Sequence, residues 1–491
     1  MNELTRVTTV VLALLGGLAF ADAPLTEKEA IEKAVARNPT LQAAVTDVRQ
    51  SVESLKAEQA RYRPTMLLDA TGTTQATPTI NSASGTTRST TQGLVFGAEL
   101  TQTFSWGTTV DLRVENRDST SKAPAFSGTT DLLSLGPGYG LIAKLAVSQP
   151  LLRGFGNEVG QAELRAALLN RKLTERVRDA TASDSLRVLQ QAYWELWYAQ
   201  KSVLIEREAR ELAGRARDEA QRKLTAGSLA DVDLLTYETR VAELDQSVLQ
   251  AEVTVRQRTA DLRRAMGETD VRASFDVASA EPQALGVVDP AAVMTAAQEA
   301  SYSVAQQQVA LEVAQNTLRT AAEATRPRLD VQAWVQTQGL GNQALKPALD
   351  QLGAFANVSG NVGVVFELPL SSERHDAQRA SAELAVTSAR QRLDAVLQQV
   401  MADTSTELAT LEQARESIAL AQRTAEVSRR NADAQHKRFL SGTAIPLEVR
   451  EAEDSLRRAQ LSIERARVNA VEAQIRLDHL TGNLLAKWGV N

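Results

Sequence analysis

The chain of 491 residues contains no cysteine, which excludes disulfides, thiolate zinc sites and cysteine nucleophiles. Aromatic residues make up only 4% of it, whereas Ala, Leu, Gln, Glu and Arg crowd long stretches. That bias is typical of long helices and coiled coils. The net charge is −6 with acids and bases interspersed, so no basic patch indicates a nucleic-acid partner.

Catalytic and metal-binding patterns are missing too. His375, His436 and His479 are scattered over charged segments, where we expect them to be exposed, and no pair has metal-ligand spacing. There is no G-x-S-x-G elbow, and "GPGYG" lacks the Lys and helix context of a phosphate loop. An enzyme, including a cell-envelope hydrolase, therefore has no candidate residues, and no cofactor or metal is expected. We expect Trp106, Trp194, Trp197 and Trp334 to be packing or interface aromatics.

Only one long hydrophobic run occurs, from Val7 to Phe20, and "AFA" closes it at Ala21. Arg6 precedes the run, so we interpret residues 1–21 as a signal peptide, the alternative being a short buried helix. No later segment has about 18 uncharged apolar residues, the length of a transmembrane helix. In an exported chain of this kind, any membrane span would have to be made of strands.

The sequence contains an internal repeat, with two copies of the same arrangement of motifs. "ARYRPTMLLDA" from Ala60 resembles "EATRPRLDVQA" from Glu323, and two tip glycines lie 442 − 227 = 215 residues apart. The closing glycines repeat that spacing, 482 − 267 = 215. We predict a first repeat over residues 22–267, a linker over 268–289, a second repeat over 290–482 and a tail over 483–491. Each repeat reads as helix, strands, long helix, tip turn and long helix.

The helices carry clear signals. "TEKE" at Thr26 is a capping box, and Pro39 and Pro446 suit first helical positions. Residues 161–226 contain one Gly and no Pro, and 372–440 contain neither, which predicts helices of roughly 100 Å. Heptad seams with coiled-coil spacing follow each tip. The predicted seam positions are Leu234, Tyr237, Val241, Leu244, Val248, Ala251, Val255, Arg258, Leu262 and Ala265, then Val449, Ala452, Leu456, Ala459, Ile463, Ala466, Ala470, Ala473, Leu477 and Leu480.

Alternating apolar and polar residues predict strands within about 65–150 and 328–370, as at Leu94, Phe96, Ala98 and Leu100. Such strands fit a sheet with solvent on one side or the wall of a membrane barrel, and the signal peptide favours the barrel. We expect two long polar loops, starting at Thr77 and at Thr120, because Gly, Ser and Thr are abundant there.

The order of these motifs resembles the TolC-like outer-membrane efflux family: duplicated halves, "NPTL" after a first helix, "SQPLLRGFG" opening a long helix, and two Gly-containing tips. The resemblance implies a homotrimer in which three chains share one outer-membrane β-barrel, continued by a long periplasmic α-helical tunnel. It also implies a periplasmic adaptor and an inner-membrane pump, of the RND or ABC class, as partners, with outer-membrane lipid around the barrel. Cargo specificity would reside mostly in the pump.

The turn "SWG" at residues 105–107 adds a hairpin that the second repeat lacks. The family barrel takes two strands from each half. The extra hairpin would extend the barrel, cap its outer end or fold back in the periplasm, and we favour a local extension.

Glu448 and Glu451 follow Pro446 at i, i+3 and share a helix face. They are either acids that complement the helix dipole or, by resemblance, pore-facing carboxylates at the narrow end of the tunnel. Three chains would turn them into rings of the kind that select cations.

Asp233 matches a family Asp that is tied to a Tyr and an Arg of the second hairpin. Those positions are Phe439 and Ala444 here, and neither side chain can hydrogen-bond, so the family lock is in question. Gly227, Ser228 and Leu229, and Gly442 and Thr443, match the tips where adaptors dock; the alternative is an ordinary hairpin turn.

The leading functional hypothesis is a passive exit duct for efflux or type I secretion. The alternative is a periplasmic coiled-coil scaffold with a small soluble sheet and no pore.

Overall fold

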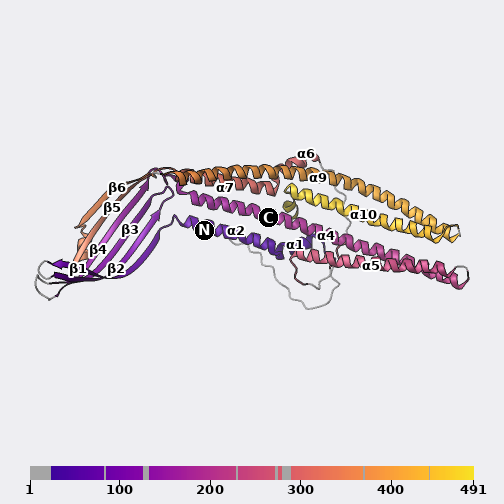
Figure 1. Cartoon of the computed structure of the whole chain (residues 1–491), viewed down its shortest axis with the longest axis horizontal. Coiled ribbons are helices and arrows are strands. Elements are labelled where there is room, and N and C mark those ends of the chain that lie inside the picture. Colours follow the sequence, from indigo (N-terminus) through magenta and orange to yellow (C-terminus); the bar gives the residue numbers. More distant parts are fainter. Residues whose placement is uncertain are drawn as a thin grey trace. The chain divides into compact units, whose positions relative to one another are not determined.

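The computed structural model describes residues 24–81, 85–124, 132–227, 230–270, 275–278, 289–368, 371–441 and 443–490. The predicted signal peptide lies outside these residues, as does most of the predicted linker. The helices are α1 Glu27–Arg37, α2 Pro39–Ala60, α3 Asn157–Gly160, α4 Ala162–Thr225, α5 Asp231–Met266, α6 Pro290–Ala300, α7 Tyr302–Ala324, α8 Lys346–Gly353, α9 Glu373–Leu440, α10 Pro446–Leu480 and α11 Leu484–Trp488 (Figure 1). The strands are β1 Thr65–Asn81, β2 Gly85–Thr103, β3 Thr109–Pro124, β4 Leu132–Pro150, β5 Arg328–Asn342 and β6 Val358–Glu367.

The chain forms two compact units. The helical unit comprises Met1–Val45, Arg178–Val304 and Leu397–Asn491, and contains α5 and α10 together with the parts of α4 and α9 that lead to the two hairpin ends. The sheet unit comprises Thr46–Val177 and Ala305–Val396 and contains all six strands. No helix in the described part of the chain is both long and apolar enough to cross a membrane.

Helix boundaries follow the predicted signals. Thr26 and Glu29 form the capping box: the Thr26 N–H donates to Glu29 Oε2 at 3.0 Å and the Glu29 N–H to Thr26 Oγ1 at 3.3 Å. Pro39 begins α2 and Pro446 begins α10, as predicted. A proline is favourable there because the first helical N–H groups have no partner within the helix.

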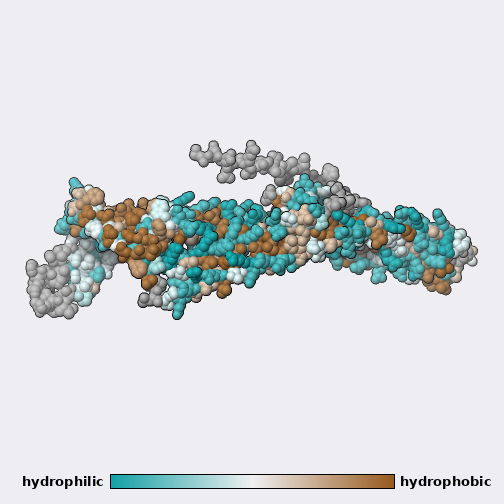
Figure 2. Space-filling model, turned by 90° about the horizontal axis from the view of Figure 1, so that it is seen from above, coloured by the Kyte–Doolittle hydropathy of each residue, from teal (hydrophilic) through white to brown (hydrophobic). Residues whose placement is uncertain are grey.

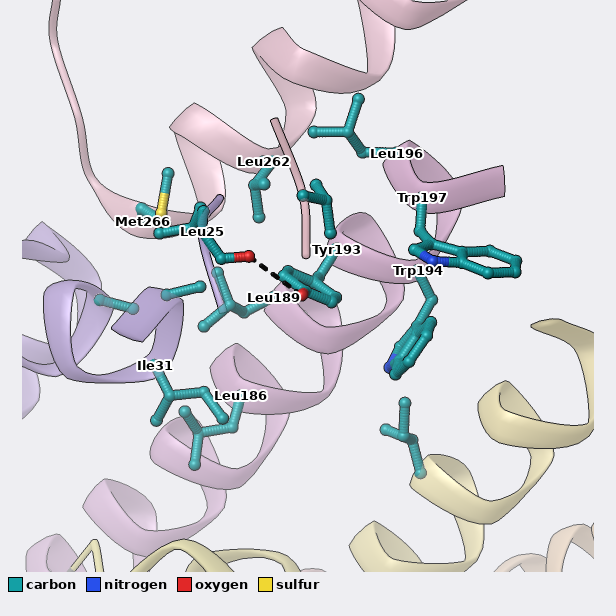
Figure 3. Close-up of a cluster of buried hydrophobic side chains, with 14 of the residues drawn as sticks. Leu25, Ile31, Leu186, Leu189, Tyr193, Trp194, Leu196, Trp197, Leu262 and Met266 are labelled. Atoms are coloured by element: carbon teal, nitrogen blue, oxygen red, sulfur yellow. Dashed lines mark hydrogen bonds between the residues drawn. The ribbon is translucent and has the colours of Figure 1, made fainter. Parts of the chain in front are cut away.

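The core of the helical unit gathers around α4 (Figure 3). Trp197 and Leu189 are almost fully buried, and Trp194 packs edge-on against Trp197 with ring centroids 5.9 Å apart. The Tyr193 hydroxyl donates to the Leu25 carbonyl at 3.1 Å, which fixes the N-terminal segment to α4. Burial of each such side chain contributes about 1.5–3 kcal/mol. The packing role predicted for Trp194 and Trp197 is confirmed.

The two repeats make the same close approach at their last glycine. A Cβ on Gly267 would lie 2.7 Å from the Arg37 carbonyl oxygen, where α1 gives way to α2. A Cβ on Gly482 would lie 2.2 Å from the Ala300 carbonyl oxygen, where α6 gives way to α7. Both glycines have a left-handed backbone, with φ of 72° and 71°. Glycine is required twice over at each position, by conformation and by space.

The predicted heptad seams lie on the inner faces of α5 and α10. The seam positions are buried or half-buried, and the small Ala residues along α10 leave room for the backbone of a neighbouring helix. The seam residues that are less than a tenth exposed are Leu234, Val241, Leu244, Leu262, Ala452, Ala459, Ala466, Ala470, Ala473 and Leu477.

The six strands form one antiparallel sheet in the order β1-β2-β3-β4-β5-β6. The predicted polar loops are mostly wrong: β1 continues to Asn81, β2 begins at Gly85, and β3 continues to Pro124. Only residues 82–84 and 125–131 between these strands lie outside the described part. Threonine is abundant in both segments, and its branched Cβ favours strands, so a polar composition did not mean a loop.

The sheet has one apolar and one charged face. Rows of directly paired residues share a face, and one row runs Met66, Leu100, Leu112, Leu145 and Val335. Figure 2 shows hydrophobic residues gathered over the strands. We call this the apolar face; its exposed large hydrophobic residues are Met66, Leu68, Leu94, Phe96, Leu100, Leu112, Val114, Leu145, Val335, Val358, Val362, Val364 and Phe366. The alternation predicted from the sequence is confirmed.

The opposite face, the charged face, centres on Arg113. Its guanidinium contacts Glu99 at 2.8 Å and both Asp69 and Glu115 at 3.1 Å. Lys144 lies in the same row and its Nζ sits 5.2 Å from the centre of the Trp334 ring. A face of this composition favours contact with water.

The extra hairpin extends the sheet in its own plane. β2 and β3 lie between β1 and β4, and a turn over Phe104–Thr108 joins them. Gly107 has φ of 96°, and its N–H donates to the Phe104 carbonyl at 2.9 Å. Trp106 stacks on Phe104 with ring centroids 4.7 Å apart. The hairpin therefore adds two strands to the sheet, and its expected place in a barrel stays a prediction.

Candidate functional site

The end of the α4–α5 hairpin, residues 225–231, has the turn chemistry that the sequence predicts. Gly227 has φ of 74°, a left-handed backbone that suits glycine after a helix, and its N–H donates to the Leu224 carbonyl at 2.9 Å. Gly227 is exposed, and no atom lies within 4 Å of where its Cβ would be. Ser228 and Leu229 lie outside the described residues. The glycine is thus needed for backbone conformation, and its surroundings are open.

The end of the α9–α10 hairpin, residues 440–446, is held by its own polar groups. The Thr443 N–H donates to the Arg438 carbonyl at 2.9 Å, and Arg438 Nη2 donates to the Thr443 carbonyl at 3.1 Å. Gly442 lies outside the described residues. Ile445 precedes α10 and is 57% exposed. This hairpin end therefore offers an apolar surface on a turn fixed by reciprocal hydrogen bonds.

The two predicted gate acids have different surroundings. Glu448 is half-buried, and its Oε2 is shielded from solvent without a hydrogen-bond partner. Glu451, three residues later, is exposed. Both lie near the start of α10, where carboxylates complement the helix dipole. An unsatisfied oxygen on Glu448 is not explained by a dipole role alone.

A cation–π contact joins the two hairpin ends near the positions that the family resemblance compares with the lock. Asp233 is exposed in the first turn of α5 and Ala444 is half-buried. The Phe439 ring instead faces Lys223 of α4, whose Nζ lies 4.8 Å from the ring centre and 3.1 Å from Glu219. The inability of Phe439 to hydrogen-bond was anticipated, but its cation–π partner was missed. The only signal for it is the matching position of Lys223 and Phe439, each just before its own hairpin end.

Further from the ends, charged pairs join the two hairpins. Arg457 of α10 contacts Glu206 of α4 at 2.7 Å, and Arg240 of α5 pairs with Asp454 of α10. Arg465 of α10 contacts Glu195 of α4 at 2.5 Å. The Arg457–Glu206 and Arg240–Asp454 pairs are largely shielded from water, so a shift in register that separated them would leave a buried charge unpaired.

Between these pairs and the hairpin ends lies a cavity of about 420 Å³. Its lining comes from both hairpins and includes Lys223, Tyr237, Arg240, His436, Phe439 and Glu453. Burial raises the pKa of the Glu453 carboxyl, and the nearby His436 and Arg240 offset only part of that rise. The site thus combines an aromatic wall with an acid that is poorly solvated.

The exposure expected for His479 is wrong. Its ring Nδ1 lies 2.8 Å from the Ser183 hydroxyl of α4, and burial, with Arg187 second, lowers the pKa of the imidazole. His436 is exposed, as expected, and His375 is half-buried. In the described ranges, no cluster of three or more His, Asp or Glu side chains could hold a metal ion. His479 is therefore a packing residue that joins α10 to α4.

The hairpins and the sheet define the fold: long antiparallel helical hairpins in one unit, and a six-stranded antiparallel sheet with one apolar face in the other. Residues 293–483 match the outer membrane efflux protein family. That range nearly coincides with the predicted second repeat. The resemblance to the TolC-like outer-membrane efflux family is thereby confirmed.

Solved structures of low sequence identity share the fold over almost the whole chain. The outer membrane protein VceC of Vibrio cholerae is 16% identical with a TM-score of 0.67, covering 93% of this chain and 96% of its own. The CmeC outer membrane channel of Campylobacter jejuni is 14% identical with a TM-score of 0.68, covering 97% and 93%. The MtrE outer membrane channel of Neisseria gonorrhoeae, in its open state, is 16% identical with a TM-score of 0.64, covering 93% and 89%. No curated protein matches the chain.

Proposed function

We propose that three copies of the chain form an outer-membrane channel, the passive exit duct of a tripartite efflux pump or a type I secretion system. The match to the outer membrane efflux protein family supports this function. Structures titled as outer membrane channels share the fold, which supports a duct rather than a periplasmic scaffold. The signal peptide would direct export, and a periplasmic adaptor would connect the duct to an inner-membrane pump.

The sheet is the observation on which the proposal mainly depends. Large apolar side chains cover one face while an Arg113-centred ionic network occupies the other. In a membrane barrel these faces would meet lipid and a water-filled lumen, respectively. β1 and β6 are the outermost strands of the described sheet. Pairing these edges between chains would close a barrel of 3 × 6 = 18 strands, without an open edge in the membrane.

Assembly and location can be tested together. The full chain, expressed with its N-terminal segment, should be extracted from outer membranes only by detergent, and native mass measurement in mild detergent should give three chains. Planar bilayers should then show ion conductance. Release by osmotic shock as a soluble monomer or dimer would contradict the proposal and favour the scaffold.

We propose that the hairpin ends are the docking and closing region of this duct. Gly227, Ser228, Leu229, Gly442 and Thr443 would contact the adaptor, and the exposed Ile445 adds an apolar contact beside them. In the family, a polar lock forms around Asp233. Here the Lys223–Phe439 contact would help to hold the aperture closed instead, and Ala444 would add no hydrogen bond.

Replacing Gly227 by Val would strain the left-handed turn by roughly 1–3 kcal/mol. Efflux should then be lost while trimers persist; normal efflux would remove Gly227 from the docking surface.

Glu448 and Glu451 would form two carboxylate rings at the aperture. Their closeness to the hairpin end and the unsatisfied Glu448 oxygen support this placement. Replacing both by Ala should weaken cation selectivity and block by multivalent cations in planar bilayers. A matched control replaces Glu412 and Glu416, two exposed acids of α9, by Ala. Equal selectivity in both double variants would leave Glu448 and Glu451 as dipole-pairing acids.

A further inference from the structure

Helix α8, in the connection between β5 and β6, packs directly on the sheet. A Cβ on Gly339 would lie 2.0 Å from the Ala348 carbonyl oxygen, and one on Gly341 would lie 2.1 Å from the Ala344 carbonyl oxygen. Ala348 is fully buried. The Gln351 amide closes the contact, since its Oε1 accepts from the Leu340 N–H at 3.1 Å and its Nε2 donates to the Leu340 carbonyl at 3.0 Å. The helix is therefore fixed to β5.

The strand register identifies the face that α8 covers. Gly339 pairs with Leu141 and Gly341 with Tyr139, and Leu141 lies two and four residues from Ala143 and Leu145 on the apolar face. Leu141 is only 7% exposed, as expected for a residue beneath α8. Because α8 lies on the apolar face, its outer surface looks toward whatever that face contacts.

The outer surface of α8 presents two large apolar side chains beside the exposed Lys346 and Asp350. Leu345 is 40% exposed and Leu349 is 50% exposed, one helical turn apart. Phe355, just after the helix, is 69% exposed and has φ of 52°. A left-handed backbone is costly for a bulky side chain, and glycine would avoid that cost. An aromatic ring held in a strained turn and left open to solvent indicates a contact outside the chain.

We propose that α8 and Phe355 form an interfacial lipid anchor, in which Leu349 and Phe355 insert at the boundary between acyl chains and headgroups. The proposal rests on the proposed function, which assigns lipid to the apolar face. Continuity of the α8 surface with that face selects lipid as the occupant. Short amphipathic helices bind such boundaries through their apolar side, and aromatic side chains concentrate there. Tyr139, paired with Gly341 at the level of α8, adds a second aromatic at this level.

The absence of cysteine allows a direct test with single-cysteine variants of the full chain. Leu349→Cys and Phe355→Cys would each carry a fluorescent label in phosphatidylcholine vesicles. Leu68→Cys and Leu67→Cys are matched controls, because these neighbours on β1 are 69% and 58% exposed and point to the apolar and charged faces, respectively. Quenching by nitroxide lipids and by aqueous iodide would be compared.

We expect nitroxide lipids to quench labels at positions 68, 349 and 355 several-fold more than the label at position 67, with iodide giving the reverse order. If position 68 meets lipid while positions 349 and 355 behave like position 67, the anchor is wrong and α8 faces water or a protein partner. If position 68 does not meet lipid either, the membrane placement of the sheet fails, and the proposed function with it.

A second variant tests the contribution of Phe355 without undocking α8. In the Leu349→Cys background, Phe355→Gly removes the ring and relieves the left-handed strain, so the Gln351–Leu340 contact should persist. Lipid quenching at position 349 should fall several-fold, whereas Ala354→Gly, at the exposed neighbour, should leave it unchanged. Equal quenching in the two variants would show that Phe355 does not anchor the helix.

Discussion

Lys223 and Phe439 join the two hairpin ends through a single cation–π contact. Such a contact is worth about 0.5–1 kcal/mol at an exposed site. Phe439→Leu keeps an apolar side chain but removes the ring. The rate of amide hydrogen exchange at the ends of α4 and α9 should then rise about two- to fivefold, which is the factor that corresponds to this loss of free energy. Lys223→Met, which also removes the ion pair with Glu219, should give at least that rise, and the double variant should give no more than Lys223→Met alone. Additive effects would show that the two residues act independently.

His479 makes the stability of the helical unit depend on pH. Burial lowers the pKa of the imidazole below its ordinary value, so the fold favours the neutral ring. Its stabilising contribution is complete above the unfolded pKa of about 6.5 and is lost as pH falls toward the lowered folded value. Thermal unfolding should therefore occur at a lower temperature at pH 5 than at pH 7.5, and His479→Gln, which cannot titrate, should reduce that difference. An unchanged difference would mean that other groups control it.

At the scale of elements, replacing the glycine that ends each repeat has two separable costs. One is backbone strain, and the other is a steric clash of the new Cβ. Gly267→Ala and Gly482→Ala would each drive a Cβ into the carbonyl of a preceding helix end. Gly489→Ala is the matched control, since Gly489 has φ of 65° but no atom within 4 Å of its Cβ position. The control should cost roughly 1 kcal/mol of unfolding free energy from strain alone. The other two variants should cost clearly more in chemical denaturation, and equal losses in all three would exclude the clash.

Capping residues, turn residues and heptad spacing predicted the helices well. Amino-acid composition alone gave a wrong prediction for two segments of the sheet. Pro39, Pro446 and Gly227 sit where proline and glycine chemistry places them, and the heptad seams are buried because their spacing fits a partner helix. The polarity of the Thr-rich segments predicts loops, but in the structure the strand preference of threonine outweighs that polarity.

Two kinds of feature could not be read from the sequence. Helix α8 spans eight residues, too short for a periodic signal, although Pro347 and the spacing of Leu345, Leu349 and Leu352 fit one. Contacts such as Arg457–Glu206 and Ser183–His479 join residues more than 200 positions apart. Many Arg, Glu and His residues occur at equivalent positions along these helices. Which of them form pairs therefore depends on the register of the packed helices, which the sequence does not give.

At the scale of the whole molecule, the extra hairpin changes the size of the proposed barrel. Four strands in the first repeat and two in the second would give three chains 18 strands, instead of the 3 × 4 = 12 that the family resemblance implies. Barrel diameter grows roughly linearly with strand number, and barrels of about 16–18 strands enclose a water-filled channel. The second repeat would then supply a smaller share of the wall than the first.

Deleting β2 and β3 tests this directly. β1 and β4 run antiparallel, and Leu68 shares a face with Ala143 through the intervening pairs, so a short turn from Asn81 to Leu132 should let them pair with the apolar face preserved. Trimers should still form, and the barrel diameter should fall to about two-thirds. Sized polyethylene glycols added on the barrel side of planar bilayers would measure the barrel diameter, because the largest polymer that enters the channel should become smaller.

The control replaces only residues 125–131 by a Gly-Ser linker. This variant keeps all six strands and should leave the size limit for polymer entry unchanged. If the deletion also leaves it unchanged, the β2–β3 hairpin is not part of the barrel wall.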